Sequence, residues 1–255
     1  MILPIEHDAV REIRLNRPPA NALTLELLTA LRQTIRTASS DGMRALVLSG
    51  APGRFSGGLD VPLLLNLERA EMAKVWQALY ALLQTIAESP IPIVAAITGH
   101  APAGGTVLTL FCDWRVMAQG EYKLGLNEVQ VGIPLPPVIT AGLRRLAGPR
   151  IAEQLAVTGS LISPEEALKA GLVDEIAAPE LVIDRALEYC HRLLNVPEVA
   201  MKVTRAEARR DLVAIFRTDM NEELQRVIEA WWHPSTQSAL HALAARLKNK
   251  SSSNA

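Results

Sequence analysis

The chain has 255 residues, of which 49% are hydrophobic and 21% are charged, a composition typical of a folded globular protein that buries a sizeable core. Its 26 basic and 27 acidic side chains leave a net charge of −1, which excludes the strongly basic surface expected of a nucleic-acid-binding protein or a polybasic membrane anchor. We therefore expect no nucleic-acid partner and no membrane partner, while a local cluster could still bind one phosphorylated small molecule.

The N-terminal half alternates short apolar runs with amphipathic segments. Residues 10–18 alternate weakly and stop at a proline, which predicts a strand that enters a turn. Thr24 is a candidate N-cap for a helix that starts at residue 25, and residues 70–89 predict a second, longer helix. Further strands are predicted in the β-rich runs at 44–50, 92–99 and 113–120. Strands that alternate with helices predict an α/β fold.

The second half is mostly helical in pattern. The predicted strand at 172–176, after a glycine, is the exception. Helices are predicted at 137–147, 149–157, 164–170, 179–194, 197–210, 211–231 and 235–248. We expect an α/β core over residues 1–195 and a helical C-terminal region over 196–255, whose last residues, KNKSSSNA, form a frayed tail.

The cysteines and the N-terminus bear on the compartment. Cys112 and Cys190 are far apart in apolar settings, which predicts reduced core thiols in a cytoplasmic protein. The first residues are broken by charges and by Pro4, so they predict neither a signal peptide nor a transit peptide. The apolar run at 90–111 is interrupted by prolines, a histidine and a glycine pair, so no membrane span is predicted. The scattered histidines show no metal-ligand spacing.

Two glycine-containing segments follow predicted buried strands, at residues 50–61 and 99–113. Glycine lets the backbone approach a ligand closely, and the first N–H groups of a helix have no partner within the helix. Such donors can bind an anion or an oxygen that becomes one during a reaction. Glycine pairs also mark ordinary tight turns. Neither segment matches the phosphate-binding patterns GxxxxGK[ST] or GxGxxG.

Glu128 lies in an apolar, amide-rich stretch at 121–137, and the nearest cation along the chain is Lys123. Burial statistics favour an exposed loop acid at such a position. The alternative is a base kept partly dry, so that its pKa rises toward the working pH. The stretch by itself leaves both interpretations open.

Several segments together resemble the crotonase, or enoyl-CoA hydratase/isomerase, superfamily. They are LNRPPANAL at 15–23, RFSGGLD at 54–60, GHAPAGGTVLTLFCDWRVMA at 99–118, GLNEVQVGI at 125–133 and GSLISPEEALKAGLVDEI at 159–176. Their order covers roughly residues 5–180. The resemblance implies a crotonase-like α/β spiral of β-β-α units, with a helical C-terminal trimerisation region and a homotrimer or a dimer of trimers. Within the superfamily, GLNE and PAGG look most like the mitochondrial-type Δ3,Δ2-enoyl-CoA isomerases.

The resemblance also implies an acyl-CoA thioester substrate and no separate cofactor, since CoA is part of the substrate. Position by position, the oxyanion hole would be formed by the backbone N–H groups of Leu59 and Gly104. The family more often has alanine where this chain has Gly57, so we expect a permissive, slightly more flexible loop. Residues in or beside the matched motifs are expected to bind the substrate: Gly57, Gly58, Asp60, Val61 and Asn127. Asp60 is further expected to fix its own loop by side-chain hydrogen bonds.

Hydratases of this family carry two glutamates, and the position of the first is Val107 in this chain. Glu128 matches the second and is the sole candidate base. Hydration needs a positioned water and coordinated proton delivery, whereas one carboxylate can move a proton between two carbons. The expectation is an isomerase that shifts a 3-enoyl-CoA double bond to 2-enoyl-CoA. An enoyl-CoA hydratase, another crotonase-type reaction and a non-catalytic acyl-CoA-binding protein remain the alternatives.

One basic segment outside these motifs also allows two interpretations. EARR at 207–210 could contact the phosphates of CoA, but a solvated helix face is the expectation.

Overall fold

Two sheets organise the chain in the computed structural model, which describes residues 1–217 and 220–252. In the larger sheet β1 and β2 form an antiparallel hairpin, and every later strand is added in parallel. The smaller sheet is entirely parallel. The larger has the order β1 (Ile2–His7), β2 (Val10–Leu15), β3 (Ala45–Ser49), β5 (Ile93–Ile97), β7 (Trp114–Ala118), β9 (Glu175–Ala177), and the smaller has β4 (Gly53–Arg54), β6 (Gly99–Pro102), β8 (Leu124–Gly125).

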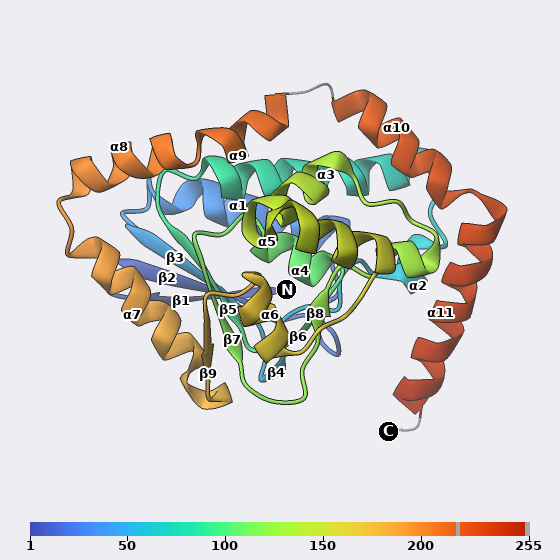
Figure 1. Ribbon diagram of the computed structural model, residues 1–255, viewed down its shortest axis with the longest axis horizontal. Coiled ribbons are helices and arrows are strands. Elements are labelled where there is room, and N and C mark those ends of the chain that lie inside the picture. Colours follow the sequence, from blue (N-terminus) through green and yellow to red (C-terminus); the bar gives the residue numbers. More distant parts are fainter. Residues whose placement is uncertain (218–219, 253–255) are drawn as a thin grey trace.

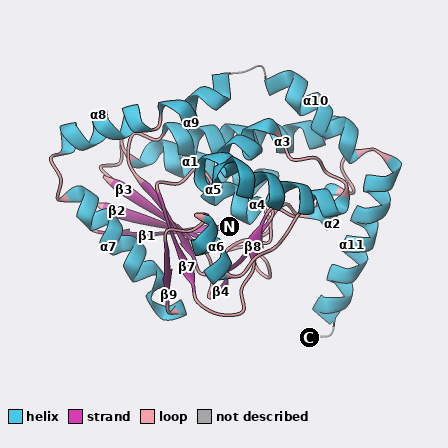
Figure 2. Cartoon of the chain, viewed as in Figure 1, coloured by secondary structure: helices cyan, strands magenta, loops and turns pink. Residues whose placement is uncertain are grey.

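Consecutive strands alternate between the two sheets. The chain places β3, β5 and β7 in the larger sheet and each following strand, β4, β6 and β8, in the smaller one. A helical segment then returns the chain to the larger sheet, so each turn is a β-β-α unit (Figures 1 and 2). This arrangement confirms the predicted crotonase-like α/β fold.

The central strands β3 and β5 are buried along their whole length because both faces of the larger sheet are covered. Side chains of a strand point alternately to opposite faces. On β3, Leu46 and Leu48 join the main core, whereas Ala45 and Val47 join a second apolar cluster. The helix α7 (Val182–Leu194) packs against β3, β5 and β7 over this second cluster.

The main core is covered by helices whose starts the sequence predicts well. Thr24 accepts a hydrogen bond from the N–H of Leu27 (3.3 Å) and so caps α1 (Leu25–Ala38), as expected. The long α3 (Arg69–Glu88) packs against α1. The segment α5 (Pro137–Thr158) is broken at Gly148, which has φ 72° and ψ 165°, so it comprises the two helices that were predicted.

The C-terminal region is helical, as predicted, with three adjustments. The described residues of the single helix predicted at 211–231 form α9 (Arg210–Ala214), a 3₁₀ turn and α10 (Met220–Trp231). The strand predicted at 172–176 is found slightly later, as β9. The last helix continues through Ser252, so the first part of the tail that was predicted to fray is helical, and residues 253–255 lie outside the described residues. The helices are α6 (Pro164–Ala170), α7, α8 (Glu198–Ala208), α9 (Arg210–Ala214), α10 (Met220–Trp231) and α11 (Pro234–Ser252), and short 3₁₀ turns lie at Pro179–Leu181 and Ile215–Arg217.

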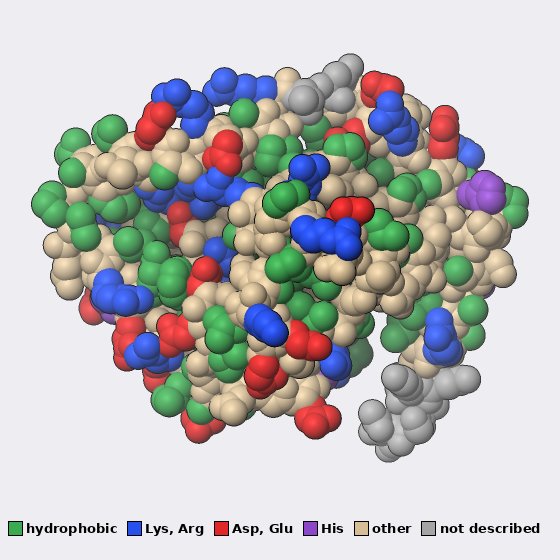
Figure 3. All heavy atoms as spheres, in the orientation of Figure 1, with side chains coloured by type: hydrophobic (Ala, Val, Ile, Leu, Met, Phe, Trp, Pro, Cys, Tyr) green, Lys and Arg blue, Asp and Glu red, His purple; other side chains and the backbone are tan. Residues whose placement is uncertain are grey.

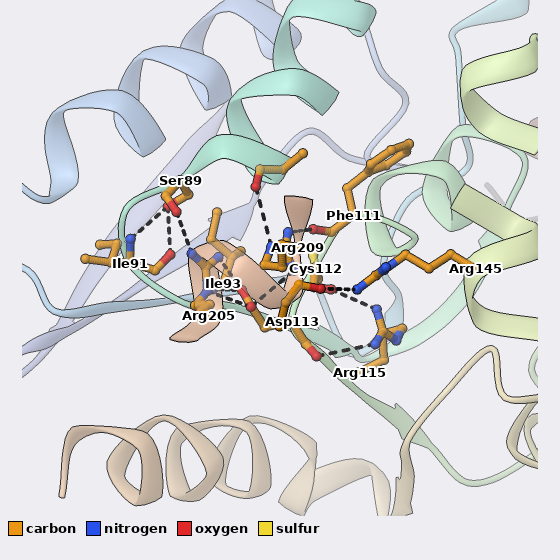
Figure 4. A network of polar contacts seen from close by, with 12 residues as sticks. Ser89, Ile91, Ile93, Phe111, Cys112, Asp113, Arg115, Arg145, Arg205 and Arg209 are labelled. Carbon is orange, nitrogen blue, oxygen red and sulfur yellow. Dashed lines mark hydrogen bonds and ion pairs between the residues drawn. The ribbon is translucent and has the colours of Figure 1, made fainter. Parts of the chain in front are cut away.

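Charge, rather than apolar burial, attaches α8 to the core. None of the residues of α8 is buried. The carboxylate of Asp113 binds Arg205 from α8 (2.7 and 2.8 Å) and Arg209 (3.1 Å), as Figure 4 shows. Arg209 is 7% exposed and also donates to the carbonyl of Phe111 (2.7 Å). The expectation of a solvated face at 207–210 is therefore wrong for Arg209, whose guanidinium is part of this buried network.

Both cysteines are free and buried, as the sequence predicts. Burial raises the pKa of the Cys112 thiol and of the Cys190 thiol to about 12 in each case, so both stay protonated at neutral pH. Across the described residues, no helix combines the length and the apolar character needed to cross a membrane.

Candidate active site

The smaller sheet brings the predicted site residues together. Its three strands are parallel, so their carboxyl ends lie at one edge. The loop with Leu59 follows β4, the start of α4 (Gly104–Thr109) follows β6, and Glu128 follows β8. Three segments that are distant in the sequence therefore leave the same edge of one sheet.

Glycine allows the first two of these segments to touch. A Cβ atom on Gly58, whose φ is +82°, would lie 3.0 Å from the nitrogen of Gly104. A Cβ on Gly104 would lie 3.1 Å from the Cα of Gly58, and one on Gly105 would lie 2.5 Å from the carbonyl oxygen of Ser56. A side chain at any of these positions would push the loop away from the helix, so the double glycines serve close backbone approach.

The two predicted donors are free to bind a ligand. Leu23 forms a parallel bridge with Leu59, in which Leu23 donates to the carbonyl of Gly58 (2.8 Å) and accepts from Asp60 (3.1 Å). In such a bridge the N–H of the central residue points to the opposite side, which places the Leu59 N–H on the side of Gly104. Neither the Leu59 N–H nor the Gly104 N–H donates to another described residue. Two unpaired N–H groups in adjacent loops suit an oxygen that gains negative charge.

A segment near the N-terminus holds the Leu59 loop in place. Asn21 donates from its side-chain amide to the carbonyl of Phe55 (3.0 Å), and Ser56 donates to the carbonyl of Asn21 (2.8 Å). The N–H of Gly57 donates to the carbonyl of Ala20 (2.8 Å). Sequence reasoning missed these supporting residues, although an asparagine at the end of the PPAN run is a usual choice for the positive φ (48°) that Asn21 adopts.

Asp60 fixes its loop, as expected. One carboxylate oxygen accepts from the N–H of Leu63 (3.2 Å) and caps the short helix α2 (Val61–Leu64), while the other binds Arg17 (2.7 Å). Val61 begins that helix and packs against the main core. The contact of Asp60 and Val61 with substrate stays a prediction.

Glu128 is not the exposed acid that burial statistics favour. It opens a 3₁₀ turn (Glu128–Val131), and its Oε2 is shielded from solvent with no hydrogen-bond partner in the described chain. Burial raises the pKa of Glu128 to about 7, against a smaller lowering by a backbone hydrogen bond. No cation in the described chain forms an ion pair with it. A carboxyl group with this pKa exchanges a proton readily at neutral pH.

Asn127, the residue before Glu128, also has a buried and unpaired side-chain oxygen. This atom, Oδ1, has no hydrogen-bond partner among the described residues. Buried polar atoms are usually paired, so two unpaired acceptors on consecutive residues mark this edge of the sheet as a place for chemistry or binding.

The last helix packs over both halves of the site. α11 contacts α2 on one side and the Glu128–Val131 turn on the other, along the right of the molecule in Figure 1. Thr236 donates to the carbonyl of Gly132 (2.9 Å), and a Cβ on Gly132 would lie 2.7 Å from that hydroxyl. Clefts of about 300 and 400 Å³ in the described chain lie between α1 and α3 and between α7 and α8, and neither is lined by Glu128.

Val107 occupies the position at which the hydratase pattern has its first acid. It lies in α4 and is 1% exposed, as part of the main apolar core. The described residues contain no group of three or more histidine, cysteine or acidic side chains suited to a metal ion.

Comparison with known proteins gives a consistent picture. The sequence profile of the enoyl-CoA hydratase/isomerase family matches residues 6–250. The chain is 33% identical over 252 residues to the human mitochondrial enoyl-CoA delta isomerase 1, and the alignment covers 96% of this chain and 83% of the human protein. It is 35% identical over 213 residues to a probable enoyl-CoA hydratase, echA17, of Mycobacterium avium (82% and 80% covered). The crystal structure of human mitochondrial Δ3-Δ2-enoyl-CoA isomerase superposes with a TM-score of 0.92 at 32% identity, covering 98% of each chain.

Proposed function

The chain belongs to the enoyl-CoA hydratase/isomerase family, and we propose that it is an acyl-CoA isomerase that moves a 3-enoyl-CoA double bond to the 2-position. One observation carries the proposal. Glu128 combines a buried, unpaired carboxylate oxygen with a pKa near 7, while the position of the first acid of the hydratases is occupied by the buried Val107.

The proposed reaction begins with the thioester carbonyl oxygen at the N–H groups of Leu59 and Gly104. The ionised Glu128 removes a proton from C2, and the electrons move through C1 to the oxygen, which gives a dienolate. The same carboxyl group then returns the proton at C4, so that the double bond lies between C2 and C3. Protons and electrons balance without an oxidant, a reductant or a cofactor, and CoA takes part only as a portion of the substrate.

The arrangement of the site supports a large rate effect. A single oxyanion donor typically contributes about 2.7–4 kcal/mol to transition-state binding, and this site offers two. A general base contributes roughly 10²–10⁴-fold. The apolar surroundings of Glu128 keep water away from the proton while it moves between the two carbons.

The second candidate is hydration of 2-enoyl-CoA, because one relative is a probable hydratase. Hydration adds a water and needs a group to hold it and to deliver its proton. Val107 supplies neither, since its side chain is apolar and buried in the core.

Separate incubations with 3-enoyl-CoA and 2-enoyl-CoA test the proposal. Isomerisation leaves the mass unchanged and creates a conjugated thioester, which absorbs in the near ultraviolet. Hydration adds the mass of one water and removes that absorbance. We expect 3-enoyl-CoA to be converted without a change of mass and 2-enoyl-CoA to gain little water. Rapid hydration without isomerisation, or binding without turnover, would contradict the assignment.

A further inference from the structure

Ala103, the residue before Gly104, has a backbone conformation that alanine rarely adopts. Its φ is 49° and its ψ is −121°, the dihedral angles of the first central residue of a type II′ turn, where glycine dominates. The other described non-glycine residues with positive φ, Asp8 and Asn21, are of types that tolerate it better. Strain of this kind persists only where the surroundings hold it, and it concentrates at functional sites.

Hydrogen bonds on both sides hold Ala103 in this conformation. Its N–H donates to the carbonyl of Gly125 in β8 (2.8 Å), and its carbonyl accepts from Val107 in α4 (3.0 Å). The buried hydroxyl of Thr106 donates to the carbonyl of Ala101 (2.6 Å) and accepts from the N–H of Gly125 (2.8 Å). The strands β6 and β8 and the first turn of α4 are therefore tied together around this residue.

The methyl group of Ala103 lies beside the loop that carries the other donor. A Cβ built on Gly58 would lie 3.1 Å from the Cβ of Ala103 and 3.0 Å from the nitrogen of Gly104. Ala103 and Gly104 thus both border Gly58, which directly precedes Leu59. A glycine at 103 would accept the positive φ without strain but would lack the methyl group that borders Gly58.

We propose that Ala103 is a positioning residue for the oxyanion hole. Its constrained backbone directs the Gly104 N–H, and its methyl group against Gly58 sets the distance from that N–H to the N–H of Leu59. The inference rests on the proposed isomerase function. Because the oxygen carries more negative charge in the transition state than in the bound thioester, a displaced donor should lower kcat more than it raises KM.

Three variants separate positioning from fold stability. Ala103→Gly should lower kcat on 3-enoyl-CoA by about tenfold or more with little change in KM, and its Tm should hold or rise because the strain is relieved. Ala103→Ser restores the Cβ and should recover most of the lost kcat. Asp8→Gly removes a positive-φ side chain in the distant β1–β2 turn and should leave kcat and KM unchanged.

A spectroscopic measurement tests the inference without turnover. The carbonyl stretching frequency of a bound saturated acyl-CoA, measured by vibrational difference spectroscopy, falls as the oxyanion hole polarises the bond. In Ala103→Gly this shift should be smaller than in the wild type. An unchanged shift with unchanged kcat would overturn the inference, and so would a loss of kcat accompanied by a fall in Tm. If the wild type isomerises no enoyl-CoA but the carbonyl shift still depends on residue 103, the proposed function fails and the positioning role stands.

Discussion

The carboxyl group of Glu128 is the residue on which the proposed chemistry depends most. Its neighbours along the chain are apolar or neutral, and none of the residues that the structure describes adds a cation that would hold it ionised. Desolvation disfavours the charged form, so the same burial that destabilises the carboxylate raises its basicity. The shielding of one side-chain oxygen from solvent thus links packing to reactivity.

Replacing Glu128 by glutamine should abolish turnover while acyl-CoA binding and the fold are retained. Glutamine keeps the shape of the side chain but cannot accept the proton, and loss of a general base costs on the order of 10²–10⁴-fold in kcat. Single-turnover kinetics on 3-enoyl-CoA, with binding of a saturated acyl-CoA as the control, measure both effects. A variant with more than about a tenth of the wild-type rate would place the base elsewhere.

The pH dependence of the reaction should report the same group. The free enzyme needs ionised Glu128, so kcat/KM should rise with pH and level off above about 7. A plot of log kcat/KM against pH should show one ascending limb with an inflection near that value. An inflection close to 4.5, the ordinary value of a glutamate, would mean that the carboxyl group is solvated in the free enzyme.

Stability should change with pH through the same group, in the opposite direction. Folding raises the pKa of Glu128, so the folded state binds the proton more tightly, and stability falls as pH rises from about 4.5 to 7. Glu128→Gln has no proton to lose. The free energy of unfolding of the variant minus that of the wild type should therefore be larger at pH 8 than at pH 4. The increase should be up to about 3 kcal/mol. Urea titrations at both pH values measure this difference, and equal differences would contradict it.

Val107 is the residue that should separate isomerase from hydratase. Val107→Glu should raise hydration of 2-enoyl-CoA modestly, since a carboxylate in an apolar core is poorly solvated and lacks supporting groups. It should lower the isomerase rate, because a second charge near Glu128 disfavours a developing anion. Val107→Gln is the neutral control, because glutamine has nearly the same shape as the introduced glutamate. Efficient hydration by the unmodified protein would show that water and proton are handled by other residues.

At the scale of elements, the site depends on short strands and on helices held by charge. β4 and β8 contain only Gly53–Arg54 and Leu124–Gly125, yet with β6 they align the loops of Leu59, Gly104 and Glu128. α8 in turn has no buried residue and is tied to the core through its arginine, Arg205.

Asp113→Asn should therefore loosen α8 and α9. The change leaves the guanidinium groups of Arg205 and Arg209 without their carboxylate, and removing one partner of a buried pair typically costs about 3–5 kcal/mol. Urea unfolding measures the loss of stability. Compared with the wild type, hydrogen exchange should accelerate more in α8 and α9 than in β5. Glu207→Gln, in the exposed pair with Arg210, is the control and should change stability by less than about 0.5 kcal/mol. If Asp113→Asn lost as little stability as the Glu207→Gln control, apolar contacts would be what holds these helices.

At the scale of the whole molecule, the exposed apolar surface predicts assembly. Val199 is 77% exposed and Val203 is 66% exposed on α8, and Val196 is 44% exposed beside them. They adjoin the cleft of about 400 Å³ between α7 and α8, whose lining includes Leu193 and Met201. Figure 3 shows apolar side chains along the edge of the molecule where α7 meets α8, at the left of the view. Monomeric proteins rarely expose such continuous patches.

We expect a homotrimer or a dimer of trimers in solution. Size-exclusion chromatography with light scattering should give a mass three or six times that of the chain, and Val199→Glu with Val203→Glu should lower it, because the charges cannot be buried at an interface. Circular dichroism should show that the double variant keeps its helices. A wild-type monomer at micromolar concentration would contradict the prediction, and an unchanged mass in the double variant would place the interface elsewhere.

Local patterns in the sequence determined the features that depend on neighbouring residues. Thr24 caps its helix because the cap needs only a hydroxyl three residues before a free N–H. The apolar runs of β3 and β5 predict strands that are buried on both faces. The motifs around Leu59, Gly104 and Glu128 identified the family and the candidate residues.

The tertiary structure alone decided how these residues cooperate. The two-residue strands of the smaller sheet carry no periodicity of their own and exist because β6 pairs with both neighbours. The strained conformation of Ala103 and the burial of Arg209 arise from contacts with residues distant in the sequence, Gly125 and Asp113 among them. The Oε2 of Glu128 is shielded from solvent only because the fold closes around it. Desolvation, a property of the surroundings in three dimensions, is what raises the pKa of this carboxyl group.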